Sequence, residues 1–120
     1  MSQFTRKERA LLLFAGLLLG ACSAWAGSKA YTLDWAHPGE ELSYRTCGCA
    51  DACWVAEVQE KASHILRARL RCDCETLYYY QPSREPQRTV LGSCDAINNG
   101  DDKFDAIGRR LQELLHRRAQ

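Results

Sequence analysis

Three features that would point to a familiar function are missing from this sequence. Its longest run of apolar residues, 10–21, has 12 residues, whereas a helix needs about 20 to cross a bilayer. The 16 Lys and Arg residues against 15 Asp and Glu residues leave a net charge of +1, so no basic surplus indicates binding to nucleic acid or to an anionic membrane. No Cys-x-x-Cys pair occurs, which excludes a thioredoxin-like redox site.

The N-terminus has the features of a secretory signal peptide. Basic residues at 6–9 precede the apolar run, and the small residues Ala24 and Ala26 follow it at the spacing of a cleavage site. We therefore expect residues 1–26 to be a signal peptide. The remaining residues, 27–120, are enough for a single small domain.

A second export route is encoded at the same place. Residues 19–22, with the sequence LGAC, resemble the lipobox of bacterial lipoproteins. Cleavage before Cys22 and acylation of its sulfur would anchor the protein to a membrane. Both routes export the same folded part, so the expected location is periplasmic or secreted, with a lipid anchor in the cell envelope as the alternative.

Six cysteines follow the export signal, and an even number in a short exported chain indicates a disulfide framework. Sequence alone leaves 15 pairings open. If residues 72–74 are extended, Cys72 and Cys74 point to one face and are too far apart to bond, so each needs a different partner. A bond from residues 47–53 to this pair would be worth about 3 kcal/mol. The expected half-cystines are Cys47, Cys49, Cys53, Cys72, Cys74 and Cys94.

A thiolate site for copper or zinc is the alternative use of these cysteines. Their Cys-x-Cys and Cys-x3-Cys spacings do not give the paired knuckles of structural zinc sites. Thiolates suit Cu(I), but the one methionine is Met1, and the histidines, His37, His64 and His116, are scattered. We expect no metal and no cofactor. The alternative functions are an exported copper or zinc carrier and a membrane-anchored lipoprotein with an assembly role.

The clearest strand is predicted at 65–76, where apolar residues and cysteines alternate with charged residues. Residues 53–60 read as its hairpin partner. With Glu60 opposite His64, the apolar faces of the two strands coincide and Glu57 lies opposite Arg67 on the wet face.

A helix over 51–66 competes with this hairpin. Asp51 would cap it, and one stripe would be formed by Trp54, Val58, Ala62 and Ile65. The interpretation as a hairpin is favoured, because Arg69 interrupts the stripe if the helix continues.

Further strands are predicted at 42–47, 76–81 and 88–94, the last weakened or bulged at Gly92. Residues 82–86 contain two prolines and predict a loop. The segment before residue 41 is expected to be irregular.

The last segment predicts a helix. After a turn at 98–100, apolar residues recur at helical spacing, with aspartates before them and basic residues after them, as the helix dipole favours. Gly108 lies inside this helix and is expected to allow close packing on the sheet. The predicted fold is α+β: a small antiparallel sheet of about four to five strands, covered on one face by a C-terminal helix and stapled by disulfides. The stripe consists of Phe104, Ile107, Leu111, Leu114 and Leu115.

No arrangement of residues predicts catalysis. Ser63 and His64 are adjacent, and neighbours in a turn or strand point apart, so a turn role is expected. Asp101 and Asp102 lack the alternating acids and distal Glu of a calcium loop and fit helix capping. We therefore expect a protein that is not an enzyme.

The remaining signal is a binding surface. Arginines alternate along the predicted strand 65–76, and three tyrosines follow, a pair of residue types that often dominates interface energies. The expected function is that of an inhibitor, immunity-type or accessory protein that docks onto another exported protein. No nucleic acid is expected as a partner, and a membrane only if Cys22 is acylated. The candidate binding residues are Arg67, Arg69, Arg71, Tyr78, Tyr79 and Tyr80.

Overall fold

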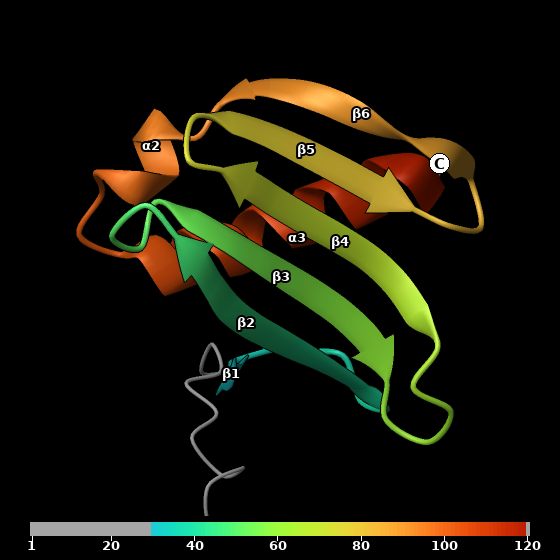
Figure 1. Cartoon of the computed structure of the whole chain (residues 1–120). Coiled ribbons are helices and arrows are strands. Elements are labelled where there is room, and N and C mark those ends of the chain that lie inside the picture. Colours follow the sequence, from blue (N-terminus) through green and yellow to red (C-terminus); the bar gives the residue numbers. More distant parts are fainter. Residues whose placement is uncertain (1–29, 120) are drawn as a thin grey trace, which may run out of the picture.

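The computed structural model describes residues 30–119 as one six-stranded antiparallel sheet and two helices (Figure 1). The predicted signal peptide and Cys22 lie outside these residues. The sheet order follows the chain, as in a meander. The elements are β1 (Ala30–Leu33), β2 (Glu40–Gly48), β3 (Cys53–Glu60), β4 (Leu66–Asp73), β5 (Thr76–Gln81), β6 (Glu85–Ser93), α2 (Asp95–Asn98) and α3 (Lys103–Ala119).

Helix α3 packs across one face of the sheet, which confirms the predicted α+β architecture. The sheet has one strand more than the four to five expected. The missed strand is β1, whose residues Ala30–Leu33 pair with Leu42 to Arg45 of β2. The expectation that everything before residue 41 is irregular was wrong, because β1 is a short and mostly exposed edge strand without alternating hydrophobicity.

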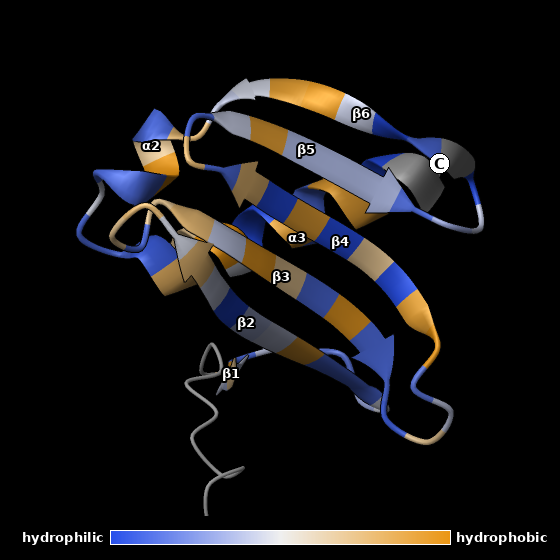
Figure 2. Ribbon diagram, viewed as in Figure 1, coloured by the Kyte–Doolittle hydropathy of each residue, from blue (hydrophilic) through white to orange (hydrophobic). Residues whose placement is uncertain are grey.

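Strands β3 and β4 form the predicted hairpin, and no helix spans 51–66. The expected register was wrong by two residues, since Glu57 lies opposite Arg69 and not Arg67. A longer turn and a bulge between Val58 and Gln59 cause the shift. From Ala68 to Cys72 the inward and outward sets survived, because an even slip keeps each side chain on its own face. Arg67, at the bulge, is the exception and contacts Glu40 on the other side of the sheet. The alternation is visible along both strands in Figure 2.

Strand β5 has its predicted bounds, and β6 begins three residues earlier than predicted, at Glu85. The predicted loop at 82–86 is correspondingly shorter. Gly92 does mark a bulge: Leu77 pairs with Gly92 while Tyr78 pairs with Val90, and Gly92 has a φ of 113°. A positive φ of this size is readily adopted only by glycine.

The core lies between the sheet and α3. Ile107 and Leu111 are fully buried and Leu114 nearly so, as the predicted stripe requires. Phe104 departs from it, since it remains 47% exposed and meets the Tyr44 ring edge-on at 4.9 Å. Trp54 is the largest fully buried side chain.

The short helix α2, which the sequence did not indicate, is tied to the sheet by polar contacts. The Trp54 indole N–H donates to Asn98 Oδ1 at 2.7 Å, and the Asn98 amide donates to the Ala52 carbonyl at 3.3 Å. A buried indole N–H needs such a partner. Asn98 therefore fixes both the Trp54 ring and the position of α2.

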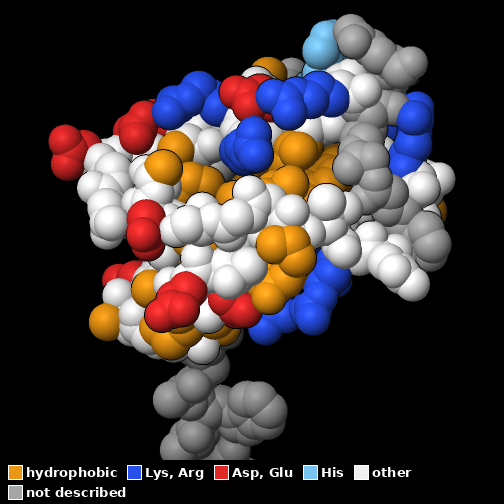
Figure 3. Space-filling model, turned by 90° about the horizontal axis from the view of Figure 1, so that it is seen from above, with side chains coloured by type: hydrophobic (Ala, Val, Ile, Leu, Met, Phe, Trp, Pro, Cys, Tyr) orange, Lys and Arg blue, Asp and Glu red, His pale blue; other side chains and the backbone are white. Residues whose placement is uncertain are grey.

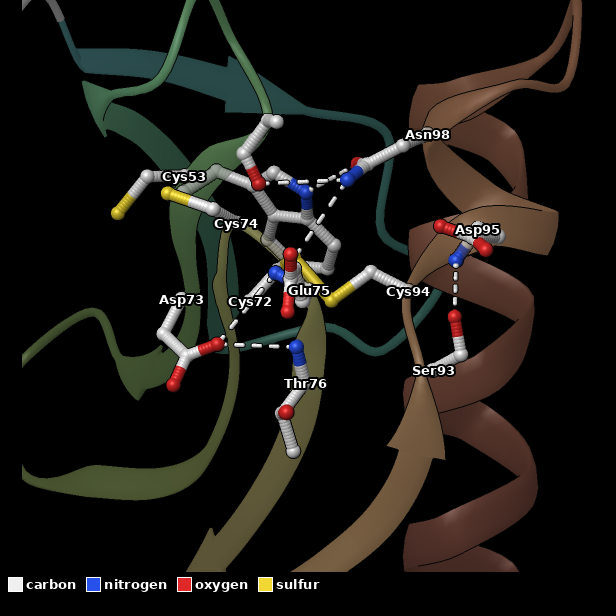
Figure 4. Close-up of a disulfide and its surroundings, with 12 residues drawn as sticks. Cys53, Cys72, Asp73, Cys74, Glu75, Thr76, Ser93, Cys94, Asp95 and Asn98 are labelled. Carbon is white, nitrogen blue, oxygen red and sulfur yellow. Dashed lines mark hydrogen bonds between the residues drawn. A yellow bond between two sulfur atoms is a disulfide. The ribbon is translucent and has the colours of Figure 1, made fainter.

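All six expected half-cystines are paired, as Cys47–Cys53, Cys49–Cys74 and Cys72–Cys94. Cys72 and Cys94 are completely buried, and their bond joins the sheet to the helical segment (Figure 4). Three disulfides indicate an oxidising compartment outside the cytoplasm.

Cys72 and Cys74 do bond to different partners, as expected. The premise that residues 72–74 are all extended was wrong. Strand β4 ends at Asp73, and Cys74 has a left-handed backbone with a φ of 86°. Its side chain therefore leaves the core face, on which Cys72 lies, and reaches Cys49 in the β2–β3 turn.

Replacing Gly108 by alanine should stabilise the protein by about 0.5 to 1 kcal/mol, the difference in helix propensity. A Cβ at this position would meet the Asp34 carbonyl oxygen and Leu42 Cδ2 at 3.9 Å each, which is ordinary contact. Gly108 is thus not needed for close packing, contrary to expectation. Urea unfolding of both proteins measures the change, and a loss of stability would show that the sheet cannot accept the methyl group.

Candidate binding face

The candidate site lies on the sheet face opposite α3. Side chains alternate along each strand, so the residues beside buried Ala56, Leu70 and Tyr79 point outward. No described element covers this side of the sheet. Its central residues line a shallow hollow of about 340 Å³, and we name them the arginine–tyrosine face: Arg69, Arg71, Tyr78, Tyr80 and Arg88.

Arg69 is held by a buried carboxylate. Its guanidinium contacts Glu57 Oε2 at 2.7 and 2.8 Å, and Glu57 is only 8% exposed. The pair is partly desolvated, so removing Arg69 would leave the Glu57 carboxylate without its partner at a cost of about 1 to 3 kcal/mol. Substitution of Arg69 is therefore expected to lower stability as well as to alter the face.

Two arginines stack on the tyrosines. The Arg88 guanidinium carbon lies 4.6 Å from the centre of the Tyr78 ring, and that of Arg69 lies 5.7 Å from the Tyr80 ring. Such cation–π contacts contribute about 0.5 to 1 kcal/mol at exposed sites. They also restrict the rotamers of both partners, so the face presents charges at defined positions.

Arg71 and Arg88 have weaker charge compensation than Arg69. Among the residues whose side chains the structure describes, neither has a carboxylate within ion-pair distance. Asp73 lies on the same face, and its Oδ1 accepts the backbone N–H of Thr76 at 2.9 Å and that of Glu75 at 3.4 Å. The Thr76 hydrogen bond is the main reason that the pKa of Asp73 is lowered, and a side-chain hydrogen bond from Tyr78 and the charge of Arg71 lower it further.

The face contains only part of the predicted set. Tyr79 is fully buried in the core, where its hydroxyl donates to Gln81 Oε1 at 2.9 Å, so it cannot contact a partner. Arg88 was not predicted. The β5–β6 register would have indicated it. Tyr78 pairs with Val90, so Val90 points to the outer face, and Arg88, two residues before Val90, points to the same face.

Arg67 lies on the opposite side of the sheet from Arg69. The bulge at Val58 and Gln59 leaves Arg67 without a pairing partner in β3. Its side chain contacts Glu60 at 3.3 Å and Glu40 at 3.9 Å, and it borders a hollow together with Leu115 of α3. The predicted stripe of three arginines is therefore broken, since a bulge redirects the side chain that it carries.

The groups considered for catalysis have structural partners. The Ser63 hydroxyl donates to Glu60 Oε2 at 2.8 Å within the β3–β4 turn, and Asp102 pairs with Arg109 at 2.8 Å. Within the described part of the chain, no group of three His, Cys, Asp or Glu side chains could hold a metal ion.

Lys103, at the start of α3, also has a structural role. Its ammonium group donates to the Asp51 carbonyl and lies 5.4 Å from the centre of the Tyr44 ring. Burial lowers the pKa of this lysine, although Asp51 acts in the opposite direction. The contact closes one end of the core against the β2–β3 turn.

A second exposed apolar area lies between β6 and α3 and is visible from above β6 (Figure 3). Leu77, Leu91 and Ile97 line it, and Arg110 and Glu113 lie at its rim. The residues that line this area include both a positive and a negative side chain but no aromatic ring. It is therefore a weaker candidate for a binding site than the arginine–tyrosine face.

Comparisons with protein-family models, with curated proteins and with solved structures give no match for this chain. Among the helices of residues 30–119, neither has the length and apolar character needed to cross a bilayer.

Proposed function

We propose that this is an exported, non-catalytic binding protein that docks onto another exported protein through the arginine–tyrosine face. The observation that carries the proposal is the fixation of arginine side chains by Tyr78, Tyr80 and Glu57 on a sheet face that no described element covers. An inhibitor, an immunity-type protein or an accessory subunit would each act in this way.

Composition and rigidity support a protein partner. Arginine and tyrosine are enriched among the residues that dominate interface energies. Here they lie on a sheet cross-linked by three disulfides, so little ordering cost is added when a partner binds. One apolar side chain, the 62% exposed Val90, flanks them on the same face and would be covered in a complex.

The proposed location is the periplasm or the medium, after cleavage before Gly27. A lipid anchor at Cys22 is the alternative, and the mass of the mature protein distinguishes the two. The metal carrier has no supporting observation, because all six cysteines of the domain are cross-linked and expose no thiolate.

Partner capture tests the docking face. Tyr80→Ala and Arg88→Ala should each strongly reduce capture of a partner from envelope extract, since central interface residues contribute about 2 kcal/mol or more. Arg110→Ala removes the same charge from α3, on the other layer, and should leave capture unchanged. Melting temperatures of the Tyr80 and Arg88 variants should fall by only a few degrees, because each variant loses one cation–π contact. Equal capture by all four proteins would contradict the proposal.

A further inference from the structure

We propose that the arginine–tyrosine face contains a subsite for one carboxylate, formed by Arg71 and Arg88 on either side of Tyr78, and that an Asp or Glu side chain of the docking partner occupies it. This inference rests on the proposed function and names the chemistry of the contact at its centre.

The distribution of charge on the face selects these two arginines. Glu57 neutralises Arg69 through a short, nearly buried ion pair. Arg71 and Arg88 have no such ion pair among the described residues. Asp73 accepts hydrogen bonds from backbone amides and interacts with Arg71 only through a weaker electrostatic effect. Most of the positive charge of the two arginines is therefore available to a group from outside the chain.

The sheet register brings the two arginines to one place. Arg71 on β4 is the direct partner of Tyr78 on β5, and Arg88 on β6 lies over the Tyr78 ring at 4.6 Å. All three residues line the same shallow hollow. Guanidinium groups bind carboxylates through two parallel hydrogen bonds. Because the stacking already restricts Arg88, less side-chain entropy is lost on binding.

The surroundings favour a single protein carboxylate over a polyanion. Glu57 and Asp73 lie on the same face and would repel a continuous row of phosphates or sulfates. Val55 and Val90 lie next to Arg71 and Tyr78 in the same cross-strand row. An acidic side chain set in an otherwise apolar protein surface matches this pattern of two cations among apolar groups.

Direct titration with a small probe tests the subsite. The probe is glutamic acid blocked as its N-acetyl and N-methylamide derivative, and blocked glutamine is the neutral control of the same shape. Side-chain Nε–Hε signals are followed by nuclear magnetic resonance at low and constant ionic strength. We expect saturable shifts at Arg71 and Arg88 with blocked glutamate and none with blocked glutamine. Arg45, on the same face but across Val55, should not shift.

Substitutions distinguish a site from general electrostatic attraction. Arg71→Gln and Arg88→Gln should each weaken binding of blocked glutamate by roughly 5-fold, as the loss of an exposed charged contact allows. Arg110→Gln lowers the net charge equally and should change the affinity less than 2-fold. Arg110 lies on α3, in the other layer, and salt screens its charge from the arginine–tyrosine face. Equal weakening by all three variants, or shifts that do not saturate, would overturn the subsite.

Two further results separate this inference from the proposed function. Tighter binding of a sulfated disaccharide than of blocked glutamate would replace the protein carboxylate by an anionic glycan. If partner capture depends on Tyr80 and Arg88 but blocked glutamate does not bind, docking stands and the carboxylate assignment fails. If blocked glutamate binds at Arg71 and Arg88 but capture does not depend on them, the subsite stands and docking through this face fails.

Discussion

Replacing Cys72 and Cys94 together by alanine should lower the free energy of unfolding by about 3 to 5 kcal/mol. In the chain-entropy model, a disulfide with a sequence separation of 22 is worth about 3 kcal/mol. The rest comes from the space left when two fully buried sulfur atoms are removed. This bond also cross-links β4 to the segment that follows β6 and leads into α3. Its loss should therefore loosen the helix first.

The disulfide Cys47–Cys53 provides the matched control. It closes a loop with a separation of only 6, which the same model values at about 2 kcal/mol. Denaturant unfolding of the two double-alanine variants at neutral pH compares them directly. A smaller loss for the Cys72 and Cys94 variant would show that the buried bond adds nothing beyond the packing around it.

Replacing Leu111 by alanine should lower stability by about 2 to 5 kcal/mol. Leu111 is fully buried at the centre of the contact between α3 and the sheet, and the shortened side chain leaves a cavity that neither rigid layer can fill. For a domain of this size, each kcal/mol lowers the melting temperature by about 4 to 8 °C. Thermal unfolding followed by circular dichroism measures the change.

The neighbouring residue supplies the control for that experiment. Gln112 is exposed on the same helix turn, and Gln112→Ala changes the helix propensity by only a few tenths of a kcal/mol. Similar melting temperatures for both variants would mean that α3 contributes little to the core. Below its melting temperature, the Leu111→Ala protein should still bind blocked glutamate, since the arginine–tyrosine face does not contact α3.

The sequence predicted the fold well wherever hydrophobicity alternates. Strands β4 and β5 and helix α3 bury one regular set of side chains each, and that set can be read from the residues alone. Strand β3 contains the expected inward set, but Val55 and Glu57 on its outer face are buried as well. Strand β1 has no such set, and α2 is held by Trp54 and Asn98, which are 44 positions apart. Contacts over that distance in sequence leave no local pattern.

The candidate site was only partly predictable for a related reason. Alternation placed Arg69 and Arg71 outward correctly. One extra residue in a bulge sent Arg67 to the other side, and nothing in the local sequence marks that bulge. Tyr79 lies between two outward tyrosines and is buried by the same alternation, so a choice among the three rings required the register.

The meander topology also bears on how fast the chain folds. Every pairing in the sheet joins strands that follow each other in sequence, so each hairpin can close over a short connection at a low cost in loop entropy. Sheets built from such local pairings have low contact order and fold faster than Greek-key sandwiches of similar size. The contact between α3 and the sheet is the long-range step. A newly made chain would therefore expose the inner sheet face until α3 arrives, and this interval is when assistance from a chaperone would matter most.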